Sequence, residues 1–166
     1  MFRETRRKKQ VLSEQECADI LARCEWGVLG LHGDDGYPYT VPLNYVYHNG
    51  IIYFHSARTG HKIDAIDRDD KASFCVVDKS DLVPEKFATA YWSVIVFGRI
   101  HKVQDQDERI DTLTALTETL AGHVDEGSKH AEVASCKMRD NVEMLALVPE
   151  YISGKRAADA ILAHHG

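Results

Sequence analysis

The amino-acid sequence predicts one domain of mainly β structure, a closed antiparallel barrel of about six strands with flanking helices. Three observations lead to this expectation. The length of 166 residues suits a single domain with a sizeable core. Six or so strand-like segments accompany two substantial helical segments. The first three strands follow one another through tight turns without an intervening helix, which favours an antiparallel meander over a parallel βαβ sheet.

The composition argues against some classes of function. The chain is 44% hydrophobic and 28% charged, with a formal net charge of -6, so we expect no nucleic-acid partner. Residues 1–10 are basic but lack an apolar core, which predicts a flexible arm, with a transit peptide or a nucleic-acid arm as alternatives. No apolar run approaches the ~18 residues of a membrane span, so we expect a cytoplasmic protein without a membrane partner. The four cysteines form no C-x-x-C pair and are expected to be reduced.

The first predicted elements are a helix and three strands. A capping box begins the helix over residues 12–24, because Ser13 can accept from the N3 amide while Glu16 reaches back. Its apolar stripe has helical spacing and consists of Cys17, Ile20, Leu21 and Cys24. Three strands follow, over residues 26–32, 39–47 and 51–56. Pro42 cannot donate a hydrogen bond to a strand ladder, so it marks an edge, a bulge or a ligand-facing site.

The later segments are less regular. In order, we expect a short helix over 59–70, a strand over 71–77, a polar loop over 78–90, a strand over 91–103, a helix over 105–121, a strand ending near Pro149 and a tail helix over 157–166. Residues 123–140 show no readable pattern.

The stretch FHSARTGHK, residues 54–62, raises the question of function. It supplies three potential cations and two hydroxyl groups: Arg58, His61, Lys62, Ser56 and Thr59. Gly60 permits a turn, and a helix that begins there directs free N–H groups and its positive dipole end to the same place. This pattern predicts a phosphate site. Two alternatives stay open: a plain turn with solvated charges, or a metal site on His55 and His61, for which no neighbouring carboxylate or thiol completes the ligand set.

Several segments together look like a known family: residues 6–21, 26–66, 71–78 and 93–100. They resemble the flavin-binding split-barrel proteins related to pyridoxamine 5'-phosphate oxidase, in particular the nitroimidazole-resistance (Nim-like) branch. The ordered combination GYPYTVPLNYVY, IYFHSA and GHK is the specific part of the resemblance. It implies a six-stranded antiparallel split barrel that forms a homodimer, with one FMN at each subunit interface.

The resemblance also implies roles for single positions. Ser56, His61 and Lys62 match the segment that holds the flavin phosphate, and Arg58 is an addition to it. The residues matching the strand along the isoalloxazine ring are Thr40, Val41, Pro42 and Leu43. Ser93 and Val94 match the start of the strand that reaches the polar edge of the ring. His55 is either a structural histidine or a catalytic group that gives a proton to a reduced product.

The sequence departs from the true oxidase at two of these positions. Thr40 stands where that enzyme has an arginine, and Ser93 stands where it has a glutamine. The basic residues that hold the pyridoxal substrate have no convincing counterpart, so oxidation of vitamin B6 is not expected.

The leading hypothesis is therefore an FMN-dependent oxidoreductase that reduces small planar acceptors such as nitroaromatics. The alternative is a non-catalytic flavin- or haem-binding protein of the same fold. Its candidate haem ligands are His123, His130, His164 and His165. A barrel that has lost its cofactor is the third possibility.

Overall fold

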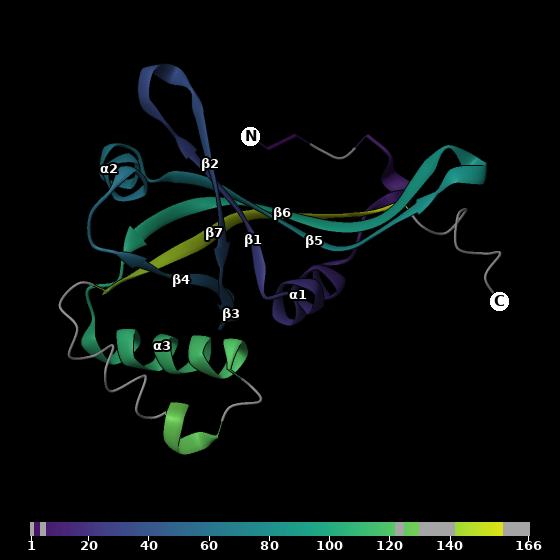
Figure 1. Ribbon diagram of the computed structural model, residues 1–166. Coiled ribbons are helices and arrows are strands. Elements are labelled where there is room, and N and C mark those ends of the chain that lie inside the picture. The colour runs from purple at the N-terminus through teal and green to yellow at the C-terminus, as the bar shows by residue number, and fades with distance from the viewer. Residues whose placement is uncertain (1, 4–5, 122–124, 130–141, 158–166) are drawn as a thin grey trace.

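The computed structural model describes residues 2–3, 6–121, 125–129 and 142–157. Its strands are β1 (Trp26–His32), β2 (Pro38–Asn44), β3 (Val46–His48), β4 (Ile51–Ala57), β5 (Lys71–Val83), β6 (Ala88–Lys102) and β7 (Val142–Arg156). Its α-helices are α1 (Glu14–Arg23), α2 (His61–Arg68) and α3 (Gln106–Leu120). The strands form one antiparallel sheet in the order β2-β1-β5-β6-β7-β4-β3, with the helices around it (Figure 1). In the described part of the chain, no helix combines the length and the apolar character needed to cross a membrane.

Tyr45 explains how this sheet closes on itself. β2 and β3 lie at opposite ends of the strand order, although this one residue separates them in the chain. The sheet must therefore curl until its two ends meet in the segment 38–48. Tyr45 is fully buried, its ring packs edge-on against Phe74 with centroids 4.9 Å apart, and its hydroxyl donates to the Leu21 carbonyl at 2.8 Å. The predicted antiparallel barrel is confirmed, and seven strands replace six because Tyr45 divides one predicted strand in two.

The barrel is open along one side. β3 pairs with β4 only from Val46 opposite Tyr53 to His48 opposite Ile51. On the N-terminal side of Tyr45 the chain forms β2, which pairs with β1 and not with β4. β2 therefore has a single neighbour in the sheet. The free edge of β2 and the end of β4 therefore border a split. Pro42 lies on an edge strand, one of the three settings expected for it.

Two apolar clusters lie on opposite sides of β4 and β7. The barrel interior contains Phe54 and Leu145, together with residues of α1. The second cluster lies beneath α3 and contains Tyr53 and Met144. Because side chains alternate along a strand, His55 points to the side of Tyr53, and Ser56 points to the side of Phe54.

The prediction of a polar loop over residues 78–90 is wrong. β5 and β6 continue as a two-stranded arm that projects from the body, paired from Lys79 opposite Trp92 to Val83 opposite Ala88 (Figure 1). The β5 half of this arm is exposed on both faces over residues 79–82, so its sequence lacks the alternation of a half-buried strand. Near its tip, Leu82 and Phe87 are 80% and 100% exposed.

The last strand also runs further than expected. β7 passes Pro149 and ends at Arg156. The pairing shifts register between Phe97 and Gly98, and Gly98 lies opposite Pro149. A bulge tolerates a residue without an N–H group, which explains why the proline does not end the strand. The tail helix expected over 157–166 lies outside the described residues apart from Ala157.

Local signals elsewhere are confirmed. The capping box is present, with the Glu16 amide donating to Ser13 Oγ at 3.2 Å and the Ser13 amide donating to Glu16 Oε2 at 2.7 Å. The strand predicted over residues 26–32 has those bounds. In the N-terminal segment, Phe2 stacks on Tyr151 with ring centroids 4.9 Å apart.

Candidate functional site

Gly60 creates a corner between β4 and α2. Its φ of +120° is a backbone conformation that L side chains rarely adopt, and it is the residue immediately before the helix. The amides of Ile63 and Asp64 donate to its carbonyl at 2.8 and 3.0 Å, which begins the first helical turn. The first amides of any helix have no partner within the helix, so this corner offers N–H groups to an anion.

Lys62 brings an uncompensated charge to the corner. Its side chain is half-buried and forms no ion pair or hydrogen bond with any described residue. Burial lowers the pKa of its ammonium group. The pKa of His55 is also lowered, first by burial and then by the charge of Lys62, so these two side chains act on each other. Ser56, which is 8% exposed, lies between them in the chain at the end of β4.

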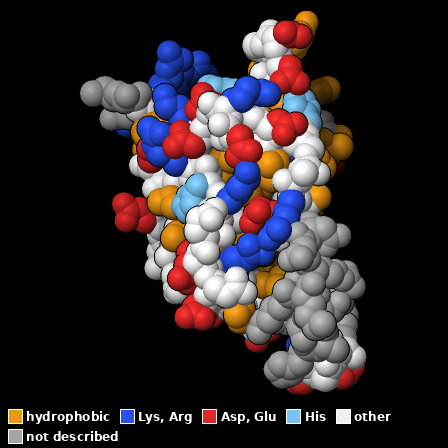
Figure 2. All heavy atoms as spheres, turned by 90° about the vertical axis from the view of Figure 1, so that its left-hand side faces the viewer, with side chains coloured by type: hydrophobic (Ala, Val, Ile, Leu, Met, Phe, Trp, Pro, Cys, Tyr) orange, Lys and Arg blue, Asp and Glu red, His pale blue; other side chains and the backbone are white. Residues whose placement is uncertain are grey.

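Arg58 has a weak internal partner. Its Nε lies 4.0 Å from Glu143 Oε2, across from Ser56 on β7. Glu143 is also 3.4 Å from Nη1 of Arg109, whose Nη2 donates to the Val142 carbonyl at 3.0 Å. Lys and Arg side chains gather on this side of the molecule with Asp and Glu among them (Figure 2). An incoming anion would therefore compete with one carboxylate for Arg58.

His61 is turned toward the β1–β2 hairpin. Its ring stacks on Tyr39 with centroids 4.1 Å apart, and its Nε2 lies 3.3 Å from Asp34 Oδ2. Arg68 also reaches Asp34, at 2.8 Å. The side chain of His61 thus anchors α2 to the hairpin, while its backbone remains at the start of the helix.

β2 offers its outer side chains and its backbone edge to a ligand. Val41 and Leu43 pack against the barrel core, whereas Thr40 and Pro42 are exposed on the outer face. Among the four residues predicted along the ring, two can therefore contact a ligand with their side chains.

The two residues predicted on β6 differ in a similar way. Val94 is fully buried in the barrel, so its side chain is closed to a ligand outside. Ser93 points outward, opposite Val77 and Lys155. On the outer face, β1 and β5 lie between β2 and β6, which is roughly 14 Å at the usual strand spacing, and the register places Phe97 rather than Ser93 in line with Thr40, so Ser93 lies about 13 Å further along β6. One chain does not bring these two groups side by side.

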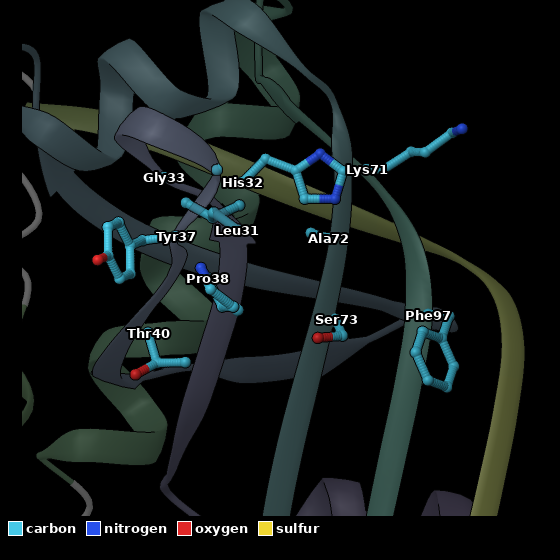
Figure 3. A pocket seen from close by; sticks show the side chains of 12 residues that line it. Leu31, His32, Gly33, Tyr37, Pro38, Thr40, Lys71, Ala72, Ser73 and Phe97 are labelled. Atoms are coloured by element: carbon cyan, nitrogen blue, oxygen red, sulfur yellow. The ribbon is translucent and has the colours of Figure 1, made fainter.

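One cavity of the described chain was not predicted from the sequence. Its volume is about 670 Å³, and it lies on the outer face across β2, β1, β5 and β6 (Figure 3). Of the residues predicted to bind the cofactor, Thr40 alone lines it. The other lining residues come from four strands and a turn without any shared motif, so no local pattern marks them.

The structure does not support the metal site considered from the sequence, and it does not describe the candidate haem ligands. Among the described residues, no group of three or more His, Cys, Asp or Glu side chains could hold a metal ion. The four histidines named as candidate haem ligands lie outside the described residues.

Comparison with known proteins gives a consistent picture. A family model described as pyridoxamine 5'-phosphate oxidase matches residues 13–156. No curated protein matches. A candidate 5-nitroimidazole antibiotic resistance protein of Bacteroides thetaiotaomicron has a TM-score of 0.70 at 22% identity, covering 88% of this chain and 86% of its own.

Two further solved structures share the fold. A FAD-binding protein of Mesorhizobium loti has a TM-score of 0.66 at 24% identity, covering 90% of this chain and 98% of its own. A FAD- and haem-binding protein of Mycobacterium smegmatis has a TM-score of 0.70 at 20% identity, covering 95% of this chain and 80% of its own. These proteins have the same split barrel.

Proposed function

Because the chain belongs to the pyridoxamine 5'-phosphate oxidase family, we propose that it is an FMN-binding flavoprotein. The observation that carries the proposal is the half-buried, unpaired ammonium of Lys62 at the start of α2. A phosphate monoester there would offset the desolvation of Lys62 and would accept from the first helical amides. Ser56 and Arg58 would add a hydroxyl and a guanidinium donor, and His61 its backbone N–H.

The flavin ring would lie along the split. The free edge of β2 at residues 40–43 borders it, and an edge strand has backbone groups without a strand partner. The outward side chains of Thr40 and Pro42 add a hydroxyl and an apolar surface. This arrangement supports a ring bound by backbone contacts and explains why no arginine is needed at Thr40.

A second copy of the chain would complete the site. The outer face of the sheet exposes large apolar side chains that a monomer would leave in water: Trp26, Val77, Ile95 and Phe97. Ser93, which is remote from Thr40 within one chain, could approach a ring bound by the partner. We therefore place one FMN at each interface of a homodimer.

The proposed activity is reduction of a small planar acceptor such as a nitroaromatic. Bound FMN would supply hydride or single-electron transfer. His55 is the proposed proton-transfer group. Burial and Lys62 favour its neutral form, and an anion beside Lys62 would favour its protonated form. The relative named for 5-nitroimidazole resistance supports this choice of acceptor.

A non-catalytic flavin or haem carrier is the second candidate, because one structural relative is named as a FAD- and haem-binding protein. The absorption spectrum of the purified protein separates the candidates. A flavin gives bands near ~370 and ~450 nm, whereas a haem gives a sharp Soret band. Mass analysis of the ligand released on denaturation would then distinguish FMN from FAD.

The phosphate site is tested with the double variant Lys62→Met/His61→Gln. We expect FMN to bind about tenfold more weakly or worse, because a charged hydrogen bond contributes about 1.5–3 kcal/mol. Riboflavin, which lacks the phosphate, should bind both proteins alike. Lys9→Met, an exposed change in the N-terminal segment, is the matched control. Equal retention of FMN by the double variant and the control would show that the phosphate lies elsewhere.

A further inference from the structure

We infer that the cavity on the outer face is the acceptor site, and that His32 holds the polar substituent of a planar aromatic ligand there. The inference rests on the proposed function for the role of that ligand as an acceptor. The existence of the ligand site rests on the cavity and on His32 alone.

The size and walls of the cavity suit a small aromatic molecule. Its volume of about 670 Å³ lies within the range of small-molecule sites. Tyr37 and Thr40 line one side, and Ser73 and Phe97 line the other (Figure 3). Phe97 is held in a group of three rings, with Phe2 at 5.5 Å and Tyr151 at 6.5 Å between centroids. Each of the two aromatic side chains offers a face on which a flat ligand can stack, and because β2 and β6 are about 14 Å apart, one small ring contacts only one of them.

Gly30 keeps the floor of the cavity open. A Cβ atom at this position would lie 2.8 Å from Ser73 Oγ, closer than real side chains approach. Gly30 is opposite Thr40 on one neighbouring strand and opposite Ser73 on the other. The floor therefore has the shape of a shallow trough between two small hydroxyl-bearing residues.

His32 presents one free ring nitrogen at the edge of the cavity. Its Nδ1 lies 2.7 Å from Asp69 Oδ2. An ionised carboxylate only accepts, so Nδ1 carries the proton and donates it. Nε2 has no partner among the described residues, and it can accept from a ligand or, when protonated, donate to one.

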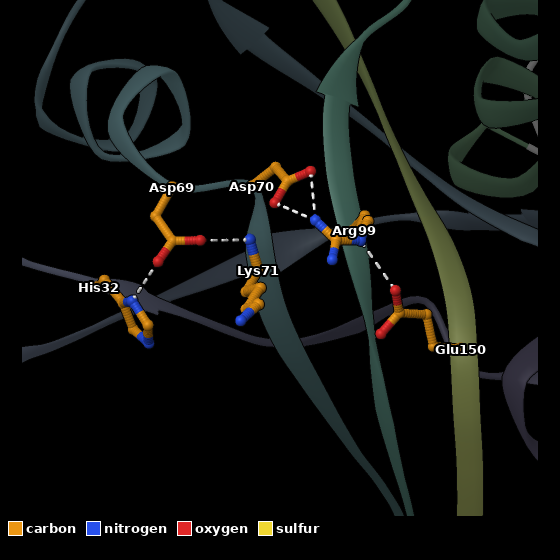
Figure 4. A network of polar contacts seen from close by, with 6 residues as sticks. All are labelled: His32, Asp69, Asp70, Lys71, Arg99 and Glu150. Carbon is orange, nitrogen blue, oxygen red and sulfur yellow. Dashed lines mark hydrogen bonds and ion pairs between the residues drawn. The ribbon is translucent and has the colours of Figure 1, made fainter. Parts of the chain in front are cut away.

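Asp69 is itself held in place (Figure 4). The backbone N–H of Lys71 donates to its Oδ1 at 2.9 Å, and this bond, followed by the one from His32, lowers the pKa of Asp69. The next residue, Asp70, accepts from Arg99 at 2.7 and 2.9 Å, and Arg99 also donates to Glu150 at 2.8 Å. Asp69 is thus positioned by the start of β5, and its contact with Nδ1 directs the other ring nitrogen of His32 away from the carboxylate.

The cavity meets the proposed flavin site at Thr40. This residue lines the cavity and belongs to the strand assigned to the ring. A flat ligand stacked on Tyr37 would therefore lie beside the ring, with a nitro or carboxylate group that accepts from the Nε2–H of His32 when His32 is protonated. The acceptor class is a small nitroaromatic, and an anionic or hydrogen-bond-accepting substituent would favour its binding.

Calorimetric titration of the purified protein with 4-nitrobenzoate tests the inference. We expect His32→Phe to weaken binding about tenfold or more, and Tyr37→Ser, an exposed turn residue, to weaken it several-fold. The control is His101→Gln, an exposed histidine outside the cavity. The flavin absorbance should be the same in all four proteins, which shows that the variants are folded and loaded.

The outcomes are distinct. Unchanged binding in His32→Phe and Tyr37→Ser overturns the inference while leaving the flavin proposal intact. Loss of binding in His55→Gln but not in His32→Phe also overturns it and places the acceptor at β4. If the protein contains no flavin but 4-nitrobenzoate still needs His32, the proposed function fails and the ligand site is supported.

Discussion

Lys62 and His55 form an electrostatic pair whose charges the fold disfavours. The ammonium of Lys62 is half-buried without a partner, and His55 has a lowered pKa because burial and Lys62 oppose its protonation. Such a pair costs stability in the empty protein and gains interaction energy when an anion binds. Perturbed titrating groups of this kind are common at functional sites.

This pair predicts a dependence of stability on pH. The folded pKa of His55 lies below its ordinary value of 6.5, so the unfolded state binds more protons as the pH falls below about 6.5. The folded protein should therefore lose stability from this group as the pH falls through that value. In the flavin-free protein His55→Gln should lose less, so the free energy of unfolding of His55→Gln minus that of the wild type, measured in urea, should increase from pH 7.5 to 5.5. A difference independent of pH would contradict the assignment.

At the scale of elements, the register of β6 against β7 depends on one glycine. Gly98 lies opposite Pro149, where the pairing shifts. A Cβ atom on Gly98 would meet the Val148 carbonyl group, with the carbonyl carbon at 2.9 Å and Pro149 Cα at 3.1 Å. Neither backbone atom can move without disturbing the strand that carries Glu143 beside the phosphate corner.

Gly98→Ala should accordingly destabilise the protein by about 1–3 kcal/mol or more, the usual cost of overpacking. Thermal unfolding should show a melting temperature lowered by roughly 2–4 °C per kcal/mol. The comparison variant is Gly36→Ala, where φ is +79° and no other atom lies within 4 Å. It measures the cost of the backbone conformation alone, about 1 kcal/mol. Equal effects of the two substitutions would argue against a steric role for Gly98.

At the scale of the whole molecule, the outer face of the sheet is the surface most suited to contact a second copy of the chain. It joins the cavity, the exposed apolar side chains and Ser93 on one side of the barrel. Exposed apolar groups of this extent are typical of a protein–protein interface. A partner seated there would border the cavity and shield the flavin edge from water.

Ile95→Asp should separate the proposed dimer, because it places a charge among apolar residues in the middle of that face. Sedimentation velocity should show the wild-type protein as a dimer and the variant as a monomer with weaker FMN binding. Gln104→Asp, an exposed change just beyond the end of β6, should leave the dimer intact. A monomeric wild-type protein that binds FMN tightly would contradict the interface.

Features encoded within a few consecutive residues were predictable from the sequence. The capping box of α1, the strand at residues 26–32 and the turn at Gly60 depend on local hydrogen bonds and turn chemistry, so they could be predicted without the fold. The corner at residues 54–62 was predictable for the same reason, because its groups are neighbours in the chain.

Only the tertiary structure decided the remaining features, because they depend on contacts between segments far apart. The bulge at Gly98 exists because Pro149 lies opposite it, and Tyr45 closes the barrel because two strand ends meet there. Ser93 points outward while Val94 is buried, because the register of the strand pairing, and not the local composition, decides which face each side chain occupies. The cavity beside His32 draws on several strands at once. No stretch of sequence contains it, and its geometry arises only when the strands pair.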